Sequence, residues 1–548
     1  MQSTKYKAQS TKYKAQTDNM VDLTGTSIIG FRRGETNGDA FRAVNPASGV
    51  ELAPDYQVAS AAEVDQAVQL ANSAFESYRH SAPKVKSAFL RKISENIESL
   101  AEVLVARATE ETGLPAARIR GETVRTCLQL RLFAQLVEEG SWVDARIDRS
   151  DPTRQPLPKP DIRSMLQPLG PVVVFCASNF PLAFSVAGGD TASALASGNP
   201  VVVKAHRAHP GTAELVGLAI RDAVRAVDLP EGVFSLLFGR GDEIGVQLVR
   251  HPLIKAGGFT GSRSGGQSLM STATARPEPI PFYAEMSSVN PVFILPGALK
   301  EKEEQIATGL HASVVLGAGQ FCTNPGLVFI PAGASSVGLI GRLEEMMSAT
   351  AAFTMLTSRI SSAYREGTMT LSQTAAVETL VQSELSRLSE GCGATASLFK
   401  TDASAFLADT GLSAEVFGPA TLLVTYTDPH QLLEIARKLE GQLTATIHAS
   451  NSESDLVRSL LEVLEHKAGR IVFNGFPTGV EVCHAMVHGG PFPATSDGRS
   501  TSVGTRAVFR FVRPVCYQDA PAAALPDELK DENPLHIWRL VDGELTKS

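Results

Sequence analysis

Between residues 170 and 261 the chain repeats one pattern, in which a short apolar segment precedes a longer segment with helical character. The apolar segments are rich in β-branched residues and read GPVVVFCA (170–177), NPVVVKAH (199–206), GVFSLLFG (232–239) and IKAGGFTG (254–261). Strands that are apolar on both faces are typical of a parallel sheet with helices on each side. The pattern therefore predicts an α/β fold with a doubly wound sheet. A second α/β unit is expected from about Pro291, where PVFIL begins another apolar strand.

Amphipathic helices are expected before this region. Ser60 and Glu63 form a capping box ahead of a helical apolar period, a second helix is predicted over residues 89–113, and a third over residues 121–140. The segment DRSDPTRQPLPKPDIRS (148–164) is rich in proline and charge and interrupts the helical pattern. It indicates an excursion between domains.

Length and composition limit the classes of protein that fit. A chain of 548 residues is too long for one core, and 43% hydrophobic with 20% charged residues is ordinary for a globular protein. The net charge of −8 argues against nucleic-acid or anionic-membrane partners, and no apolar run reaches the length of a membrane span. The six scattered cysteines form no disulfide framework and no zinc-ligand spacing, so we expect no metal cofactor and a reducing, cytoplasmic setting.

The N-terminus contains a duplication. STKYKAQ occurs at residues 3–9 and again at residues 10–16. We predict that residues 1–20 are a disordered leader or the product of a misassigned start, with Met20 as a plausible true start. A basic tail with a function of its own is the alternative.

Cys322 lies in GQFCTNPG (319–326), among small and polar residues rather than the aliphatic neighbours of a core cysteine. Glycine lets a substrate approach the backbone closely, while Thr, Asn and Pro favour a turn. A thiol in a polar, accessible turn suits a nucleophile, which acts as the thiolate. An inert buried cysteine remains the alternative until partners are found.

Candidate partners occur upstream. GGFTGSRSGG (257–266) predicts strand, turn and helix, in which the turn at Gly261 and Ser262 could hold a phosphate. Glu285 is the only charge in AEMSSVNPVFIL (284–295), and we expect burial to raise its pKa, as suits a general base. Asn179 follows an apolar strand in SNFP (178–181), where its amide could stabilise an oxyanion. A buried structural carboxylate and a helix-capping turn are the alternative interpretations of Glu285 and Asn179.

In combination these segments resemble the NAD(P)-dependent aldehyde dehydrogenase superfamily over residues 22–518. Six motifs in family order carry the resemblance: SNFP, VVVKAH (201–206), FTGS (259–262), AEM, GQFC and EVFGP (415–419). Residues 171–217 and 488–518 are most similar to the branch that contains 2-oxoglutarate semialdehyde (2,5-dioxopentanoate) dehydrogenases and NADP-linked fatty aldehyde dehydrogenases.

The resemblance implies a modified Rossmann cofactor domain, an α/β catalytic domain and a small β oligomerisation arm. The expected boundaries are 21–147 and 168–287 for the cofactor domain, 288–490 for the catalytic domain, 148–167 and 505–518 for the arm, and 519–548 for a C-terminal extension without assigned function. A homodimer or homotetramer is expected.

The family mechanism assigns roles to matching residues. Cys322 would attack the aldehyde, Asn179 and the backbone N–H of Cys322 would stabilise the oxyanion, and Glu285 would activate the water that releases the acid. Glu415 would bind the nicotinamide ribose, with Phe417 against the ring. One departure is that Ser287 and Ser288 stand where the family commonly has glycines, which affects the expected mobility of Glu285.

Cofactor choice is indicated by the segment from Lys204 through His206 to Arg207. NAD-preferring members commonly have a glutamate at the position of Arg207, whereas a guanidinium pairs well with a 2′-phosphate. We therefore predict NADP, with NAD possible, and Arg240 in GRGDEIG (239–245) as a second contact. A solvated surface arginine is the alternative.

Substrate choice is indicated by Arg125, which falls on a helix that resembles the one lining the family's substrate channel. An arginine there, with Phe184 on the wall, would need an anion such as the distal carboxylate of 2-oxoglutarate semialdehyde. The alternative is that Arg125 turns outward to pair with Glu122 or with another acidic neighbour. We expect oxidation of this semialdehyde to 2-oxoglutarate, in sugar-acid or hydroxyproline catabolism, with a fatty aldehyde as the second candidate. Glu285 argues against an acylating enzyme, and the set Cys322, Glu285 and Asn179 against a purely structural protein.

Overall fold

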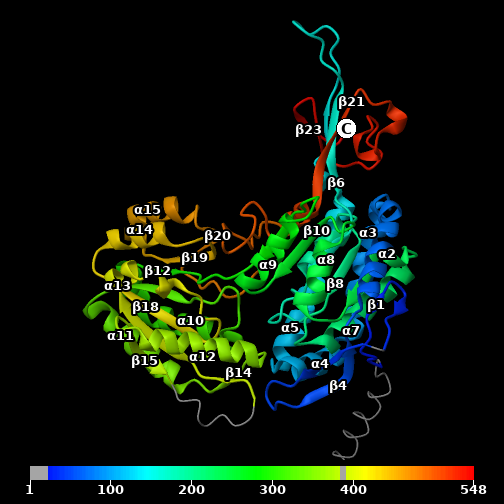
Figure 1. The fold of residues 1–548 in the computed structure, drawn as a ribbon. Coiled ribbons are helices and arrows are strands. Elements are labelled where there is room, and N and C mark those ends of the chain that lie inside the picture. The colour runs from blue at the N-terminus through cyan, green and yellow to red at the C-terminus, as the bar shows by residue number, and fades with distance from the viewer. Residues whose placement is uncertain (1–21, 37, 383–390) are drawn as a thin grey trace, which may run out of the picture.

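The computed structural model describes residues 22–548 except residue 37 and residues 383–390, so the predicted leader at 1–20 lies outside the described residues. Figure 1 shows two α/β bodies side by side, with a narrow β arm that projects from them and carries the C-terminus. No helix within the described ranges is long and apolar enough to cross a membrane.

The first body is built on a seven-stranded sheet in the order β11-β10-β7-β8-β9-β1-β2. Its strands are β1 (Ile28–Ile29), β2 (Arg32–Arg33), β7 (Val172–Phe175), β8 (Val201–Lys204), β9 (Phe234–Leu237), β10 (Ala256–Thr260) and β11 (Phe282–Glu285). Strands β7 to β11 pair in parallel, as predicted. Because β7 is flanked by β8 on one side and β10 on the other, the strand order reverses there. Ligands bind at the carboxyl edge of such a switch point.

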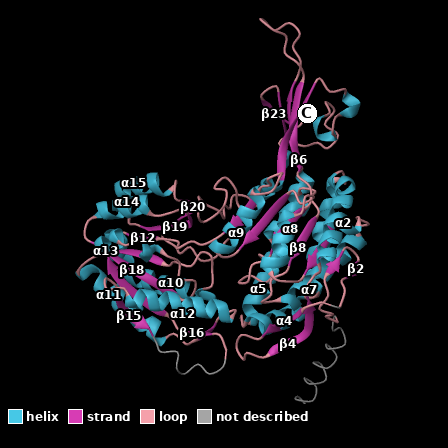
Figure 2. Cartoon of the chain, in the orientation of Figure 1, coloured by secondary structure: helices cyan, strands magenta, loops and turns pink. Residues whose placement is uncertain are grey.

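Helices cover both faces of this sheet (Figure 2). One face packs against α3 (Pro83–Ser99), α4 (Ala101–Thr112), α5 (Ala116–Glu139), α6 (Gly189–Ala196) and α7 (Pro210–Ala226), and the other against α2 (Ala61–Arg79), α8 (Val246–Arg250) and α9 (Arg263–Thr274). Val172 and Val174 lie in the first core and Val173 in the second, which explains why the strand is apolar throughout.

The predicted helices before the sheet are partly corrected. The capping box of Ser60 and Glu63 is present, and Gly113 ends α4 at a φ of 67°, in the left-handed region that glycine tolerates. The predicted single helix over 89–113 is wrong. Leu100 leaves the helical conformation at φ −96° and ψ 4° and separates α3 from α4.

The second body contains a sheet in the order β15-β17-β18-β13-β12-β19-β20. Its strands are β12 (Val292–Ile294), β13 (Leu327–Pro331), β15 (Glu378–Gln382), β17 (Ser397–Asp402), β18 (Ala420–Tyr426), β19 (Gln442–His448) and β20 (Ala468–Phe473). Its helices are α10 (Pro296–Val315), α11 (Ala334–Ala349), α12 (Ser358–Gln373), α13 (Ala403–Ala408), α14 (Pro429–Lys438) and α15 (Ser454–Leu464). Two smaller sheets pair β3 (Ala40–Val44) with β4 (Glu51–Gln57), and β14 (Phe353–Thr354) with β16 (Gly393–Ala394).

The arm is a five-stranded sheet in the order β21-β6-β5-β22-β23. Its strands are β5 (Arg146–Asp148), β6 (Ile162–Pro168), β21 (Val512–Gln518), β22 (Arg539–Val541) and β23 (Glu544–Thr546). The C-terminal residues therefore complete the arm and share its small core with Ile147 and Met165. Before β21, residues Thr505–Phe511 form a 3₁₀-helix whose Val508 and Phe511 lie in the core of the first body.

Candidate functional site

Cys322 lies in the turn between α10 and β13, at the end of an element as predicted, and it is half-buried. The turn is tight, since Gly317, Ala318 and Gly319 all have positive φ angles of 57–65°. A Cβ on Gly319 would lie 2.2 Å from the backbone of Gly418, so only glycine fits there. A side chain from outside the loop also holds it in place, because Nδ2 of Asn290 donates to the carbonyl oxygen of Cys322 over 2.8 Å.

Glu285 is the last residue of β11 and is 4% exposed. Its Oε2 accepts a hydrogen bond from the Ser502 hydroxyl over 2.7 Å, and its Oε1 lies 2.9 Å from Nε2 of His488. The same Nε2 is 3.4 Å from the sulfur of Cys322. A buried imidazole thus stands between the thiol and the carboxylate.

The chain brings His488 and Ser502 to this place by pairing a late segment with β11. Thr495 forms an antiparallel bridge with Glu285, and Met286 donates its N–H to Ala494. The recess of about 260 Å³ behind Glu285 is lined by these residues together with Phe259, Tyr283 and Arg510.

The predicted direction of the Glu285 pKa is wrong. Burial does push the pKa of this carboxyl group upward, but the neighbouring His488 and hydrogen bonds to the carboxylate, including that of Ser502, outweigh it and hold the pKa below its ordinary value. Burial, with the nearby Glu285 charge, raises the pKa of the Cys322 thiol well above its ordinary value. A neighbouring proton acceptor is therefore needed to form the thiolate.

Asn179 lies in the turn after β7, beside the cysteine loop. Its Nδ2 donates to the carbonyl oxygen of Gln320 over 3.0 Å, and its backbone oxygen accepts from Nη2 of Arg118 over 2.9 Å. The guanidinium of Arg118 also stacks on Phe180 and Phe321, at 4.8 and 4.5 Å from the ring centroids. The structure thus brings the amide of Asn179 to the backbone of the loop that carries Cys322.

Arg125 lies on the inner face of α5 rather than outside it. Its guanidinium carbon is 5.2 Å from the centre of the Phe184 ring, and its Nε donates to the carbonyl oxygen of Val480 over 3.3 Å. Both Nη atoms are buried and form no hydrogen bond within the described part of the chain. Burial lowers the pKa of Arg125, which the charges of Glu122, Cys322, Glu481 and Glu285 oppose.

The alternative pairing of Arg125 with Glu122 is wrong. Glu122 is 5% exposed, and its Oε1 accepts from the backbone N–H groups of Leu182 and Ala183, both over 2.9 Å. Its ion-pair partner is Arg118, at 3.8 Å. Glu122 therefore positions the loop that carries Phe184 and leaves the guanidinium of Arg125 without a carboxylate.

The predicted cofactor residues gather at the carboxyl edge of the first sheet. Lys204 ends β8 and is 7% exposed, and Ser262 caps α9 directly after Gly261, accepting from the N–H of Gly265 over 3.3 Å. The exposed Arg207 lies 4.9 Å above the Phe41 ring, and the exposed Arg240 follows β9. His206 stacks on His209 and accepts at Nδ1 from the N–H of Ala208.

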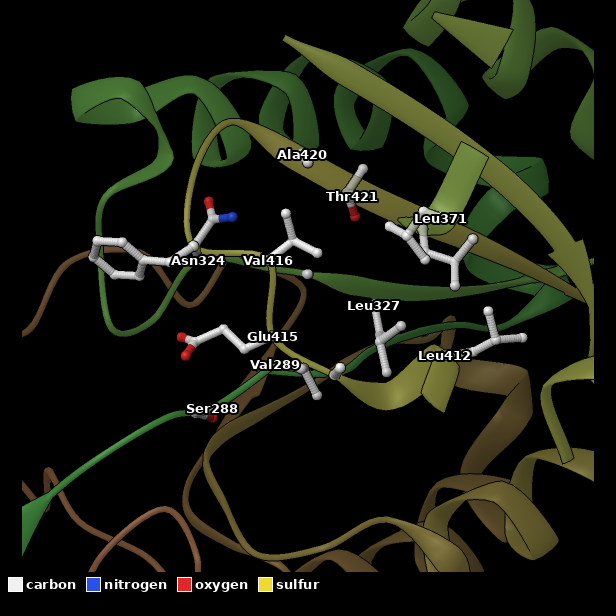
Figure 3. Close-up of a pocket in the computed structure, with 14 residues that line it drawn as sticks. Ser288, Val289, Asn324, Leu327, Leu371, Leu412, Glu415, Val416, Ala420 and Thr421 are labelled. Atoms are coloured by element: carbon white, nitrogen blue, oxygen red, sulfur yellow. The ribbon is translucent and has the colours of Figure 1, made fainter. Parts of the chain in front are cut away.

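Glu415 and Phe417 lie on the second body, at a recess of about 410 Å³ that Ser288, Val289 and Asn324 also line. In Figure 3 the carboxylate of Glu415 points away from the apolar end of this recess, which Leu327, Leu371 and Leu412 form. Glu415 is exposed as a residue.

Sequence reasoning missed His488, Ser502, Asn290 and Arg118. The separation of 166 residues between Cys322 and His488 is no motif. The available signal was the segment HGGPFP (488–493), whose first residue combines a titratable side chain with two following glycines.

Comparisons with known proteins agree on one family. A family model described as "Aldehyde dehydrogenase family" matches residues 31–491. The chain is 50% identical over 525 residues to alpha-ketoglutaric semialdehyde dehydrogenase 2 of Azospirillum brasilense, covering 96% of this chain and 100% of the relative. It is 45% identical over 530 residues to alpha-ketoglutaric semialdehyde dehydrogenase of Acinetobacter baylyi, with the same coverage of 96% and 100%.

Solved structures share the fold at low identity. A 3,6-anhydro-L-galactose dehydrogenase in complex with NAP matches with a TM-score of 0.78 at 21% identity, covering 90% of this chain and 99% of that chain. Lactaldehyde dehydrogenase from Escherichia coli matches with a TM-score of 0.78 at 19% identity and the same coverage.

Proposed function

This chain belongs to the aldehyde dehydrogenase family, and on that premise we propose that it oxidises 2-oxoglutarate semialdehyde to 2-oxoglutarate with NADP as hydride acceptor. The semialdehyde is the substrate in the names of the two relatives at 50% and 45% identity. The observation in this chain that carries the proposal is Arg125, a buried guanidinium with two unpaired Nη atoms.

The reacting groups follow from the contacts of Cys322. Its thiol gives its proton to Nε2 of His488, 3.4 Å away, and the sulfur attacks the aldehyde carbon to form a thiohemiacetal. Glu285, 2.9 Å from the same nitrogen, stabilises the imidazolium. The amide of Asn179 and the backbone N–H of Cys322 stabilise the developing oxyanion.

When held by the residues at the edge of the first sheet, NADP would supply the acceptor for the hydride that the thiohemiacetal loses as it becomes a thioester. Glu285 then acts as general base on the water that attacks the thioester carbonyl. The Ser502 hydroxyl, which donates to Oε2 of Glu285 over 2.7 Å, fixes the orientation of the carboxylate. The acid leaves, and the cysteine sulfur is regenerated.

The far end of the substrate is assigned to Arg125 and Phe184. The two buried Nη atoms of Arg125 have no hydrogen-bond partner among the described residues, and this desolvation cost is one that a carboxylate with two oxygens offsets. Phe184, whose ring centre is 5.2 Å from this guanidinium carbon, would also contact the short carbon chain between the aldehyde and the carboxylate. A fatty aldehyde has no anion to offer, so this feature favours the oxo acid over the second candidate.

The preference for NADP is supported by cations at the sheet edge. Lys204 is buried, and its ammonium group forms no hydrogen bond or ion pair among the described residues. Arg207 and Arg240 are exposed and available to a 2′-phosphate. The N-terminus of α9 at Gly261 and Ser262 suits a pyrophosphate, and Glu415 suits the nicotinamide ribose. His206 would line the adenosine end of the bound cofactor, and Phe417 would line its nicotinamide end.

We further infer that the enzyme works in a reducing cytoplasm. We also infer that it is a homo-oligomer. All six cysteines are free, and the nucleophile works only as a thiolate. The arm supplies apolar surface for a second copy, since Leu157 and Leu545 are 69% and 68% exposed.

The proposal is tested by steady-state kinetics on 2-oxoglutarate semialdehyde, glutaric semialdehyde, pentanal and decanal, with NADPH formation as the signal. We expect Arg125→Leu to raise KM for both carboxylate substrates about 100-fold and to leave pentanal unchanged, since a charge-assisted pair contributes about 2–3 kcal/mol. Arg120→Leu, on the exposed side of the same helix, should match the wild type. Equal KM values in Arg125→Leu and wild type, or decanal as the best substrate, would overturn the proposal.

A further inference from the structure

The contacts around Cys322 bring three metal-ligand types together from three distant segments. The sulfur of Cys322, a ring nitrogen of His488 and a carboxylate oxygen of Glu285 all lie within 4.8 Å of one another. The closest pairs are His488 to Cys322 at 3.4 Å and His488 to Glu285 at 2.9 Å. The three residues are far apart in the sequence and form no ligand motif, because only the fold makes them neighbours.

One of the three separations already has the value expected between tetrahedral zinc ligands. Bond lengths of about 2.3 Å to sulfur and about 2.0–2.2 Å to nitrogen and oxygen place neighbouring ligand atoms roughly 3.4–3.6 Å apart. The sulfur–nitrogen pair already has this spacing, and the carboxylate needs to withdraw by about half an ångström. We propose that Cys322, His488 and Glu285 form an inhibitory site for a thiophilic divalent cation of the Zn²⁺ type.

Charge and access support such a site. Oε1 of Glu285 is buried and lies 2.9 Å from Nε2 of His488. When the cation binds, the sulfur–metal bond forms and the thiol proton leaves to solvent. One thiolate and one carboxylate then balance a charge of +2. Cys322 is half-buried as a residue, and water would complete the coordination of the cation.

Two features make the site weaker than a structural zinc site. Arg125 and Arg470 carry charges that act on Cys322 and oppose a cation. Nδ1 of His488 has no partner among the described residues, whereas zinc-bound imidazoles are usually held by a second contact. Binding is therefore reversible, and it removes the nucleophile and the general base together. The cation competes with the aldehyde.

The test uses the reduced, metal-free full chain and Co²⁺ as the probe. We expect one equivalent of Co²⁺ to give a sulfur-to-cobalt charge-transfer band that Zn²⁺ abolishes. Cys322→Ala should lose the band, and His488→Gln should bind Co²⁺ at least about tenfold more weakly. The matched controls Cys483→Ala and His484→Ala, whose side chains lie outside the cluster, should bind as the wild type does.

A second measurement needs no variant. Saturating Zn²⁺ should slow the alkylation of Cys322 by iodoacetamide, followed by peptide mass spectrometry, and a chelator should restore it. A band that persists in Cys322→Ala, unchanged affinity in His488→Gln, or alkylation that Zn²⁺ does not slow would each overturn the inference. None of these readouts uses an aldehyde or NADP, so the proposed oxidation could stand if the metal site failed.

Discussion

Single side chains at the edge of the first sheet combine burial with charge. Lys204 is the clearest case, because burial, together with Arg207, lowers its pKa to about 8 against the opposing charges of Cys176 and Asp242. Lys204 is therefore cationic below about pH 8 and neutral above it. If its ammonium binds the 2′-phosphate, affinity for NADP should fall about tenfold between pH 7 and pH 9, because one unit above a pKa about one tenth of the group is protonated. Calorimetric titrations with NADP, and with NAD as a control, measure this. Lys204→Arg should flatten the profile, and a profile that is equally steep in this variant would contradict the assignment.

Among the elements, helix α7 depends on its neighbour α4 for its N-terminal cap. His209 at the N-cap provides no side-chain hydrogen bond, and Glu111 of α4 instead accepts from the N–H groups of Gly211 and Thr212 over 2.7 and 2.9 Å. Glu111 is fully buried and pairs with Arg107 at 3.0 Å. We expect Glu111→Ala to lower the free energy of unfolding by about 3–5 kcal/mol, because the substitution leaves buried donors and a cation unpaired. Urea unfolding followed by circular dichroism tests this. The exposed neighbour Glu110→Ala is the control, and equal midpoints for the two variants would refute the cap.

At the scale of the whole molecule, the arm is one folding unit made of two distant parts of the chain. Leu525, Leu529, Ile537 and Val541 cover Ile147 and Met165, and the buried Arg539 binds the carbonyl oxygens of Lys530, Asp531 and Ser548. Removing residues 519–548 should therefore expose the apolar face of β5 and β6. We expect the shortened chain to bind a hydrophobic dye and to aggregate in light scattering, whereas Leu545→Ser, on the exposed side of β23, stays dispersed. A shortened chain that behaves as the full chain does would show that the arm is stable without its C-terminal strands.

The sequence predicts a structural feature well when the residues that cause it are close together in the chain. Val172 to Phe175 are apolar because both faces of β7 are covered, and the capping box at Ser60 involves residues only three apart, so both were readable. The break at Leu100 was not, because the apolar period continues across it. Glu285 was identified as a candidate, but the direction of its pKa depends on His488, whose position only the folded chain reveals. Arg125 was identified as a candidate because a charged side chain is unusual on that face of the helix. Glu122 does not pair with it because the carboxylate of Glu122 binds the backbone N–H groups of Leu182 and Ala183.

The pairing of the segment around Thr495 with β11 affects how the chain folds during its synthesis on the ribosome. Translation produces Cys322 and Glu285 long before it produces His488 and Ser502. A nascent chain therefore carries the sulfur and the carboxylate without the imidazole that joins them, and the outer edge of β11 is unpaired until residues 494–496 emerge. If these residues act as proposed, the chain is inert through most of its synthesis. A product of a truncated message that ends before residue 488 would have the thiol but no means of using it in this way.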